Sequence, residues 1–133
     1  MGQYLEILKQ ECPDIPIIWT GDLNIARTPI DVHFGNIRHK KKNLTDPIKL
    51  ETARLKYWES DLIKGIGDKA YPGFTQEERG NFNDILELGF IDIWRHLNPK
   101  LEYDGYTWWN MRIPAYRPHN KGWRIDYFLI DDQ

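Results

Sequence analysis

The spacing of apolar residues predicts a helix at the start of the chain and a short buried strand after it. Residues 2–10 place Leu5 and Leu8 on one side of a helix. The helix-breaking stretch 11–14 follows. Residues 15–19 form an apolar, β-branched run flanked by proline and glycine, which is typical of a buried strand.

The middle of the chain predicts a polar loop over residues 35–46, followed by an amphipathic helix. Asp46 can cap a helix and Pro47 tolerates its first position, so we expect the helix to begin there. It should continue to Gly65, where glycine ends the pattern. Its apolar positions repeat at helical spacing and are Leu50, Ala53, Tyr57, Trp58 and Leu62.

A second helix is predicted from the spacing of Thr75 and Glu78, which is that of a capping box. This helix should end at Gly89. The residues expected to point inward from it are Phe82, Ile85 and Leu86.

The last third of the chain predicts strands. Residues 90–94 are compatible with a strand or a turn, and residues 106–109 are aromatic and β-branched, so they favour a strand. Residues 110–122 form a basic loop that contains proline, and residues 123–130 are the clearest strand. Helices and strands in this order predict a layered α/β architecture.

Length and charge limit the classes of function. A chain of 133 residues predicts one domain, and a net charge of −2 gives no global reason to bind a polyanion. The charge is nevertheless uneven, because residues 105–125 contain no acid. The basic side chains of that stretch are Arg112, Arg117, His119, Lys121 and Arg124.

The cellular compartment can be predicted only coarsely. A single cysteine, Cys12, favours a reducing compartment, and no apolar run approaches the length of a membrane span. The charged N-terminus excludes a signal peptide, so we expect an intracellular protein, nuclear or cytoplasmic (nucleoid), and not a secreted one. The basic run 38–42 is compatible with a nuclear signal, although a solvated loop is the more common explanation.

Asp22 and Asn24 are candidate site residues because they follow the first predicted strand. Two residues apart, they face one way if the chain is extended. A carboxylate offers a hard oxygen for magnesium or a base for water, and an amide can bind a phosphate oxygen. By themselves, residues 21–24 are more often a simple turn.

Asp126 is a candidate because alternation in residues 123–130 places it mid-strand, on the same face as Arg124 and Phe128. A buried carboxylate is costly unless it is paired. Either Arg124 is its partner, or Asp126 orients a histidine or a metal-bound group, and the strand alone leaves both possibilities open.

The aromatic residues are a third candidate group. Aromatic side chains most often form core, but a pocket for a flipped-out sugar also needs flat apolar walls. The residues concerned are Tyr106, Trp108, Trp109 and Trp123. His96 and His119 are isolated histidines, for which surface or core hydrogen bonding is the simplest explanation.

Five blocks of the sequence, taken in order, resemble those of a known family. The blocks are IPIIWTGDLNIARTPIDVH (15–33), YPGFTQEER (71–79), FIDIWRHLNP (90–99), YTWWNMR (106–112) and NKGWRIDYFLI (120–130). They are similar to exonuclease III-type apurinic/apyrimidinic (AP) endonucleases, a family of the endonuclease/exonuclease/phosphatase superfamily. Five blocks in the family's order outweigh the turn-only interpretation of Asp22 and Asn24.

The resemblance implies a DNase I-like fold, a four-layer α/β sandwich, of which residues 1–133 are the C-terminal half. It implies a Mg²⁺-dependent (Mn²⁺ possible) AP endonuclease and 3′–5′ exodeoxyribonuclease of base excision repair. Such an enzyme hydrolyses the phosphodiester 5′ to an abasic site in double-stranded DNA.

The resemblance also implies a role for each matching residue. Asp22 positions or deprotonates the attacking water and is a possible metal contact, while Asn24 binds the phosphate. Asp126 pairs with a catalytic histidine and holds its tautomer. The residues implied for DNA binding are Trp108 and Trp123, which line the sugar pocket, and Asn120 and Arg117, which contact the duplex.

The chain departs from the family in three ways. The family's N-terminal half has no counterpart here, the final Ser-Asp-His strand is absent, and residues 35–70 are an insertion. Because half a sandwich exposes an apolar sheet face, we expect this chain alone to be inactive and the missing half to be its partner. A fragment of a longer reading frame is preferred over a split enzyme.

Two other functions remain as alternatives. Related sandwiches hydrolyse inositol phosphates or RNA tails, although residues 122–128 favour abasic DNA. A catalytically inactive nucleic-acid-binding module is the second alternative.

Overall fold

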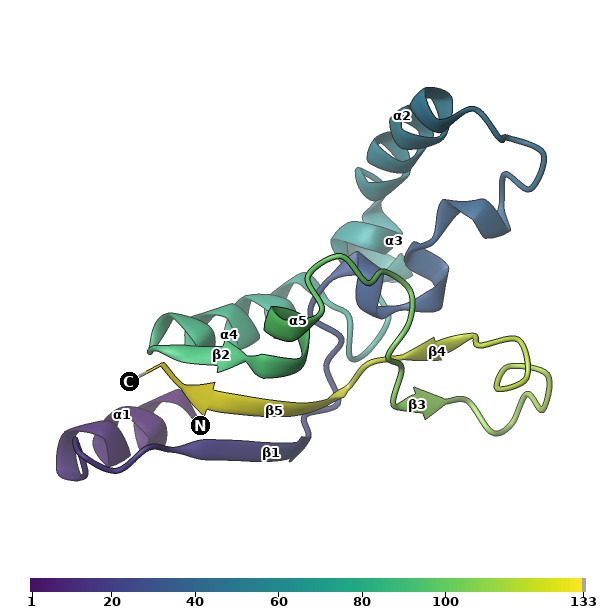
Figure 1. Cartoon of the computed structure of the whole chain (residues 1–133). Helices are drawn as coiled ribbons and strands as arrows, with labels where there is room; N and C mark the ends of the chain where they lie inside the picture. Colours follow the sequence, from purple (N-terminus) through teal and green to yellow (C-terminus); the bar gives the residue numbers. More distant parts are fainter. Residues whose placement is uncertain (133) are drawn as a thin grey trace.

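The computed structural model describes residues 1–132 and is organised around a three-stranded antiparallel sheet (Figure 1). Its strand order is β1-β5-β2, so the last strand of the chain lies in the centre. The strands are β1 (Ile18–Asp22), β5 (Asp126–Asp131) and β2 (Phe90–Asp92). Each end of β1 pairs with the opposite end of β5, Ile18 with Ile130 and Asp22 with Asp126.

Two helices pack on one face of this sheet. They are α1 (Gly2–Glu11) and α4 (Gln76–Glu87). Both helices were predicted, and the capping box of Thr75 and Glu78 is present. The core that they enclose with the sheet consists of Leu5, Phe82, Phe90, Tyr127 and Leu129. Tyr127 and Leu129 are alternate residues of β5, so burial follows the two-residue period of a strand.

The opposite face of the sheet is exposed. Ile18 and Phe128, large apolar residues of this face, are 67% and 59% exposed. The expectation of a buried strand at residues 15–19 is therefore wrong: β1 begins only at Ile18, and four of its five residues are exposed. An apolar run indicates that the side chains of a strand must be covered by other residues. It does not show whether the residues that cover them belong to this part of the chain.

The strand predicted over residues 123–130 is divided in two. Gly122–Trp123 (β4) pairs with Trp108–Trp109 (β3) in a separate two-stranded sheet, and β5 starts only at Asp126. Between them the Arg124 amide donates to the Asp31 carbonyl rather than to a neighbouring strand. The strand expected at residues 106–109 is shorter than predicted.

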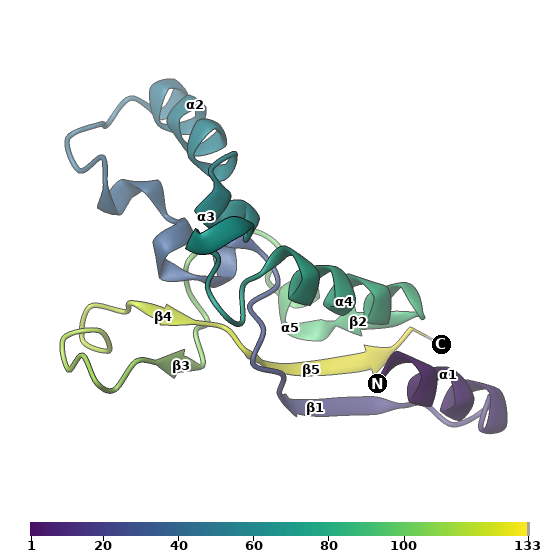
Figure 2. The same cartoon turned by 180° about the vertical axis from the view of Figure 1, so that it is seen from behind.

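The insertion forms an arm that projects from the sheet in both views (Figures 1 and 2). Three 3-10 turns lead into it, Pro29–Asp31, His33–Gly35 and Ile37–His39. Helix α2 (Pro47–Trp58) then begins at the predicted cap, and the Asp46 side chain accepts from the amides of Ile48 and Lys49.

The single helix expected to reach Gly65 is interrupted. Helix α2 ends at Trp58, Ser60 adopts an extended conformation, and a short helix α3 (Asp61–Lys64) follows. Gly65 then takes the left-handed conformation that ends α3, as its position predicted. A further 3-10 turn, Gly67–Lys69, completes the arm. The helical spacing of apolar residues continues across the break at Ser60, so spacing alone does not predict that break.

Helix α5 (Ile93–Leu97) follows β2 directly, and Asp92 is its cap. The ambiguous stretch 90–94 is thus a strand that passes into a helix. In the described residues no helix is both long and apolar enough to cross a membrane.

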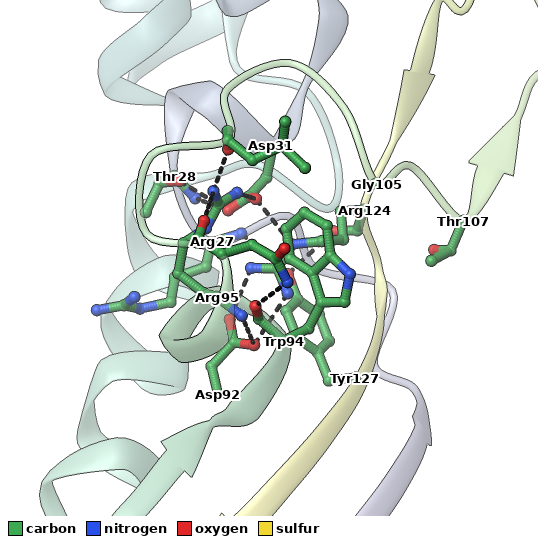
Figure 3. A network of polar contacts seen from close by, with 12 residues as sticks. Arg27, Thr28, Asp31, Asp92, Trp94, Arg95, Gly105, Thr107, Arg124 and Tyr127 are labelled. Carbon is green, nitrogen blue, oxygen red and sulfur yellow. Dashed lines mark hydrogen bonds and ion pairs between the residues drawn. The ribbon is translucent and has the colours of Figure 1, made fainter.

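A buried ion-pair network joins these elements (Figure 3). Arg124 is 2% exposed, and its two Nη atoms donate to the two carboxylate oxygens of Asp92 at 3.0 and 2.6 Å. Its Nε donates to Asp31 at 2.8 Å, and Asp31 also accepts from Arg95 at 2.6 Å. The planar guanidinium is thereby held by two carboxylates from distant parts of the chain.

The pairing of Arg124 with Asp126 considered from the sequence is wrong. Asp126 is exposed, whereas Arg124 is buried, because the irregular backbone between β4 and β5 ends the strict alternation. Burial by itself would raise the pKa of Asp31, but the Arg124 charge and hydrogen bonds from Arg124, Thr28 and Arg95 outweigh it and lower that pKa.

Replacement of Arg124 should destabilise the protein strongly. Arg124→Leu leaves two carboxylates buried without their main partner, so we expect a loss of about 3–5 kcal/mol in the free energy of unfolding. Urea unfolding followed by tryptophan fluorescence measures it. The matched control is Arg112→Leu at an exposed arginine, expected to cost less than about 0.5 kcal/mol. Equal losses in both variants would contradict the role given to the network.

Candidate active site

Asp22 and Asp126 lie opposite each other at one end of the sheet. They are Cα partners in the β1–β5 register, and both side chains are exposed. Like charges at directly opposed positions repel each other across two strands. This end of the sheet is therefore suited to a cation or a proton donor, which would relieve the repulsion.

Asn24 is held beside Asp22 by a turn. The Asp22 carboxylate accepts a hydrogen bond from the backbone amide of Asn24 at 2.8 Å, and Asn24 has a φ of 54°. The turn considered from the sequence is therefore present. It directs both side chains to the same pocket, so a turn and a site are not exclusive alternatives here.

Gly73 explains how the loop before α4 approaches this turn. A Cβ atom at Gly73 would lie 2.7 Å from the Asn24 carbonyl oxygen, and its φ is 86°. The Glu78 carboxylate accepts from the amides of Gly73 and Thr75 and from the Thr75 hydroxyl. The capping box thus both starts α4 and holds the loop against Asn24.

A pocket of about 540 Å³ opens beside Asp22 and Asn24. Residues from β1, from the base of the arm and from the β3–β4 hairpin form it. Its lining consists of Asp22, Asn24, His33, Phe34, Tyr71, Pro72, Trp108, Asn110, Ile113, Tyr116, Lys121, Trp123 and Ile125. The structure therefore brings four of the predicted site residues to one cavity, namely Asp22, Asn24, Trp108 and Trp123.

Aromatic rings form the walls of this pocket. Trp108 and Trp123 meet edge to face with centroids 6.1 Å apart. Phe34 lies 5.5 Å from Trp123 and 5.1 Å from Tyr71, so the rings form a continuous wall. Phe34, Tyr71 and Tyr116 were not predicted as site residues. Their sequence signal was present, since Phe34 directly follows one resembling block and Tyr71 begins another, but single aromatic residues are usually core.

Asn120 and Arg117 lie in the hairpin loop but do not line the pocket. Both contact Trp109: its Nε1 donates to the Asn120 side chain at 3.3 Å, and the Arg117 guanidinium stacks 5.1 Å from the ring centroid. The Arg117 and Asn120 side chains are exposed. Their predicted role in DNA contact stays a prediction.

The described residues do not form a metal site by themselves. In residues 1–132, no three His, Cys, Asp or Glu side chains are grouped as a metal site would require. Asp22, Asp126 and Asn24 nevertheless supply the hard oxygen atoms that Mg²⁺ or Mn²⁺ prefers. His96 and His119 are exposed and lie outside the pocket, whereas His33 lines it.

Thr107 holds Asp126 at the break between β4 and β5. Its hydroxyl oxygen accepts from the amides of Ile125 and Asp126, each at 3.1 Å. Its own amide donates to the Trp123 carbonyl at 2.9 Å. One residue therefore holds the backbone of Asp126 and of two pocket-lining residues, Trp123 and Ile125, a role that the sequence did not indicate.

Comparison with known proteins identifies a family. The sequence pattern described as the Endonuclease/Exonuclease/phosphatase family matches residues 2–133. A DNA-(apurinic or apyrimidinic site) endonuclease of Dictyostelium discoideum is 36% identical over 86% of this chain and 23% of its own length. An exodeoxyribonuclease of Streptococcus pneumoniae is 30% identical over 99% of this chain and 37% of its own length.

Solved structures of related proteins have the same fold. An AP endonuclease from Leishmania major superposes with a TM-score of 0.64 at 26% identity, over 98% of this chain and 33% of that one. This likeness confirms the expected α/β class and DNase I-like fold. The chain spans between about a fifth and two fifths of the length of the relatives compared.

Removal of the Thr107 hydroxyl should loosen the Asp126 end of β5. Thr107→Val deprives two amides of their acceptor, so we expect a loss of about 1–2 kcal/mol in stability and faster exchange of the Asp126 amide hydrogen. Thr107→Ser keeps the hydroxyl and is the matched control. Hydrogen exchange and urea unfolding test this, and equal exchange in the two variants would disprove the assignment.

Proposed function

The chain belongs to the endonuclease/exonuclease/phosphatase family, and we propose that it is the C-terminal part of a divalent-metal-dependent AP endonuclease with 3′–5′ exodeoxyribonuclease activity. The observation that carries this proposal is the pocket, in which Asp22 and Asn24 lie beside two tryptophan rings. Carboxylate and amide groups suit phosphodiester chemistry, and flat rings suit a sugar that has left the base stack.

The groups of the chain itself suggest a division of labour. Asp22 positions or deprotonates the attacking water, and Asn24 donates to a phosphate oxygen. Trp108 and Trp123 enclose the abasic sugar and exclude water from it. The Asp22 carboxylate is also the group of this chain that would contact Mg²⁺ or Mn²⁺, while the main ligands come from the rest of the domain. When bound, the metal would stabilise the negative charge that develops on the phosphate.

Asp126 would act through a histidine supplied by the rest of the domain. Its carboxylate is exposed at the end of β5 and is fixed at its amide by Thr107. An acid in this position can orient an imidazole and hold one tautomer, as in other acid–histidine pairs. Asn120 and Arg117 would contact the duplex from the hairpin loop.

The exposed face of the sheet supports the idea that the remaining half of the sandwich covers it. Ile18 and Phe128 stand on this face without apolar cover, and the relatives compared are more than twice as long as the matched region. Burial of about 100 Å² of apolar surface stabilises by roughly 2.5 kcal/mol, so covering this face favours association of the halves.

Abasic-site cleavage can be tested on defined substrates. We expect the completed domain to cleave an abasic duplex with Mg²⁺, in preference to an intact duplex or an inositol phosphate, and residues 1–133 alone to be inactive. Product analysis on gels and phosphate release measure this. If the completed domain showed no preference for the abasic duplex, abasic DNA would be excluded as its specific substrate. Full activity of residues 1–133 alone would show that the second half is not needed.

The role of Asp22 has a separate test. In the completed domain Asp22→Asn should lower turnover by at least about 10²-fold, because the base is lost. The asparagine oxygen can still accept from the Asn24 amide, so affinity for the abasic duplex should be retained. Asp84→Asn, at an exposed acid of α4, is the control. Turnover retained in Asp22→Asn, measured under single-turnover conditions, would remove Asp22 from the chemical step.

A further inference from the structure

The arm carries a concentration of positive charge that the chain as a whole does not have. Residues 35–70, which form the arm, contain nine lysines and arginines and five acids, a formal charge of +4. The whole chain has a charge of −2, so the remaining residues carry −6. Charge separated in this way creates a local positive potential that acts on polyanions despite the acidic balance of the chain.

Intramolecular pairing does not account for the basic run, defined here as residues 38–42. In the described part of the chain the arm's ion pairs involve Arg54, with Glu51 and Glu102, and Lys64, with Glu59. Lys41 and Lys42 are exposed and take part in none of the ion pairs of residues 1–132. Helix α2 also has no buried residue, so the arm adds little to the core.

The arm is nevertheless fixed to the wall of the pocket. The Tyr57 hydroxyl donates to the Phe34 carbonyl at 2.9 Å, and the Trp58 indole donates to the Gly35 carbonyl at 3.1 Å. Lys40 lies over the Tyr57 ring, 4.5 Å from its centroid. Because Phe34 lines the pocket, these contacts set the basic run at a fixed place relative to it.

The arm and the β3–β4 hairpin leave the body at the same end of the sheet, away from α1, in both views (Figures 1 and 2). Seven residues separate Phe34 from Lys41, so at most about 25 Å of extended chain lies between them. With about 3.4 Å per base pair, the basic run is within about seven base pairs of a nucleotide in the pocket.

We propose that the basic run is a second phosphate-binding contact, which holds the duplex on one side of the nucleotide in the pocket. This inference rests on the proposed function, because it takes its substrate from there. Lys41 and Lys42 neutralise backbone phosphates of the flanking duplex, and Lys40 positions the run through Tyr57. The contact does not depend on the base sequence, because the phosphate groups are the same at every nucleotide.

Removal of the two free charges should weaken binding in a way that depends on salt and on duplex length. The completed domain, without metal, is titrated with a duplex that carries a tetrahydrofuran abasic analogue between flanks of about 12 base pairs, more than one helical turn. Lys41→Ala/Lys42→Ala should bind it several-fold more weakly, with a salt slope smaller by about 1–2. The deficit should decrease as one particular flank is shortened from about 12 to about 3 base pairs, and it should persist when the other flank is shortened.

Lys64→Ala/Lys69→Ala removes the same charge from the base of the arm and should bind like the unsubstituted protein. An equal deficit in this control would show an effect of net charge alone and overturn the proposal. A deficit unchanged by shortening either flank, or no deficit at all, would also overturn it and leave the run as a targeting signal or a solvated loop. Failure of the proposed function is distinguishable, since the unsubstituted protein would then bind abasic and intact duplexes equally.

Discussion

The buried guanidinium of Arg124 is the constraint on which the rest of the structure depends. It lies between Trp123 and Ile125, both of which line the pocket, and pairs with Asp31 and Asp92. A buried arginine is tolerated only when its donors are satisfied, so both acids must come to it. The position of the central strand is thereby tied to the base of the arm and to the start of α5 (Figure 3).

The pocket is a consequence of this junction. The chain leaves β4 and enters β5 at Arg124, and the change of sheet places the half-buried Trp123 in the pocket wall and leaves Asp126 exposed at the end of the other sheet. Thr107 fixes the new direction, and Gly73 allows the loop before α4 to reach Asn24. Residues far apart in sequence thus converge where the two small sheets meet, and they form one concave site there.

Two surfaces of the molecule remain uncovered, and they differ in character. The sheet face with Ile18 and Phe128 is apolar, which suits the packing of another protein layer. The arm is strongly positive and buries little, which suits a hydrated polyanion. The arm leaves the body near the end of the sheet that bears Asp22 and Asp126, whereas the apolar face extends along the sheet from Ile18, so a protein layer and a nucleic acid would cover different surfaces.

The sequence by itself determined the local elements and the family. The capping box at Thr75 and the cap at Asp46 depend on neighbouring residues, so they were predicted correctly. The five sequence blocks, read in order, identified the family. Only the tertiary structure decided that Arg124 pairs with acids 93 and 32 residues away and that Asp126 is exposed. Alternation describes one regular strand, and it stops at a backbone break whose hydrogen bonds come from remote segments.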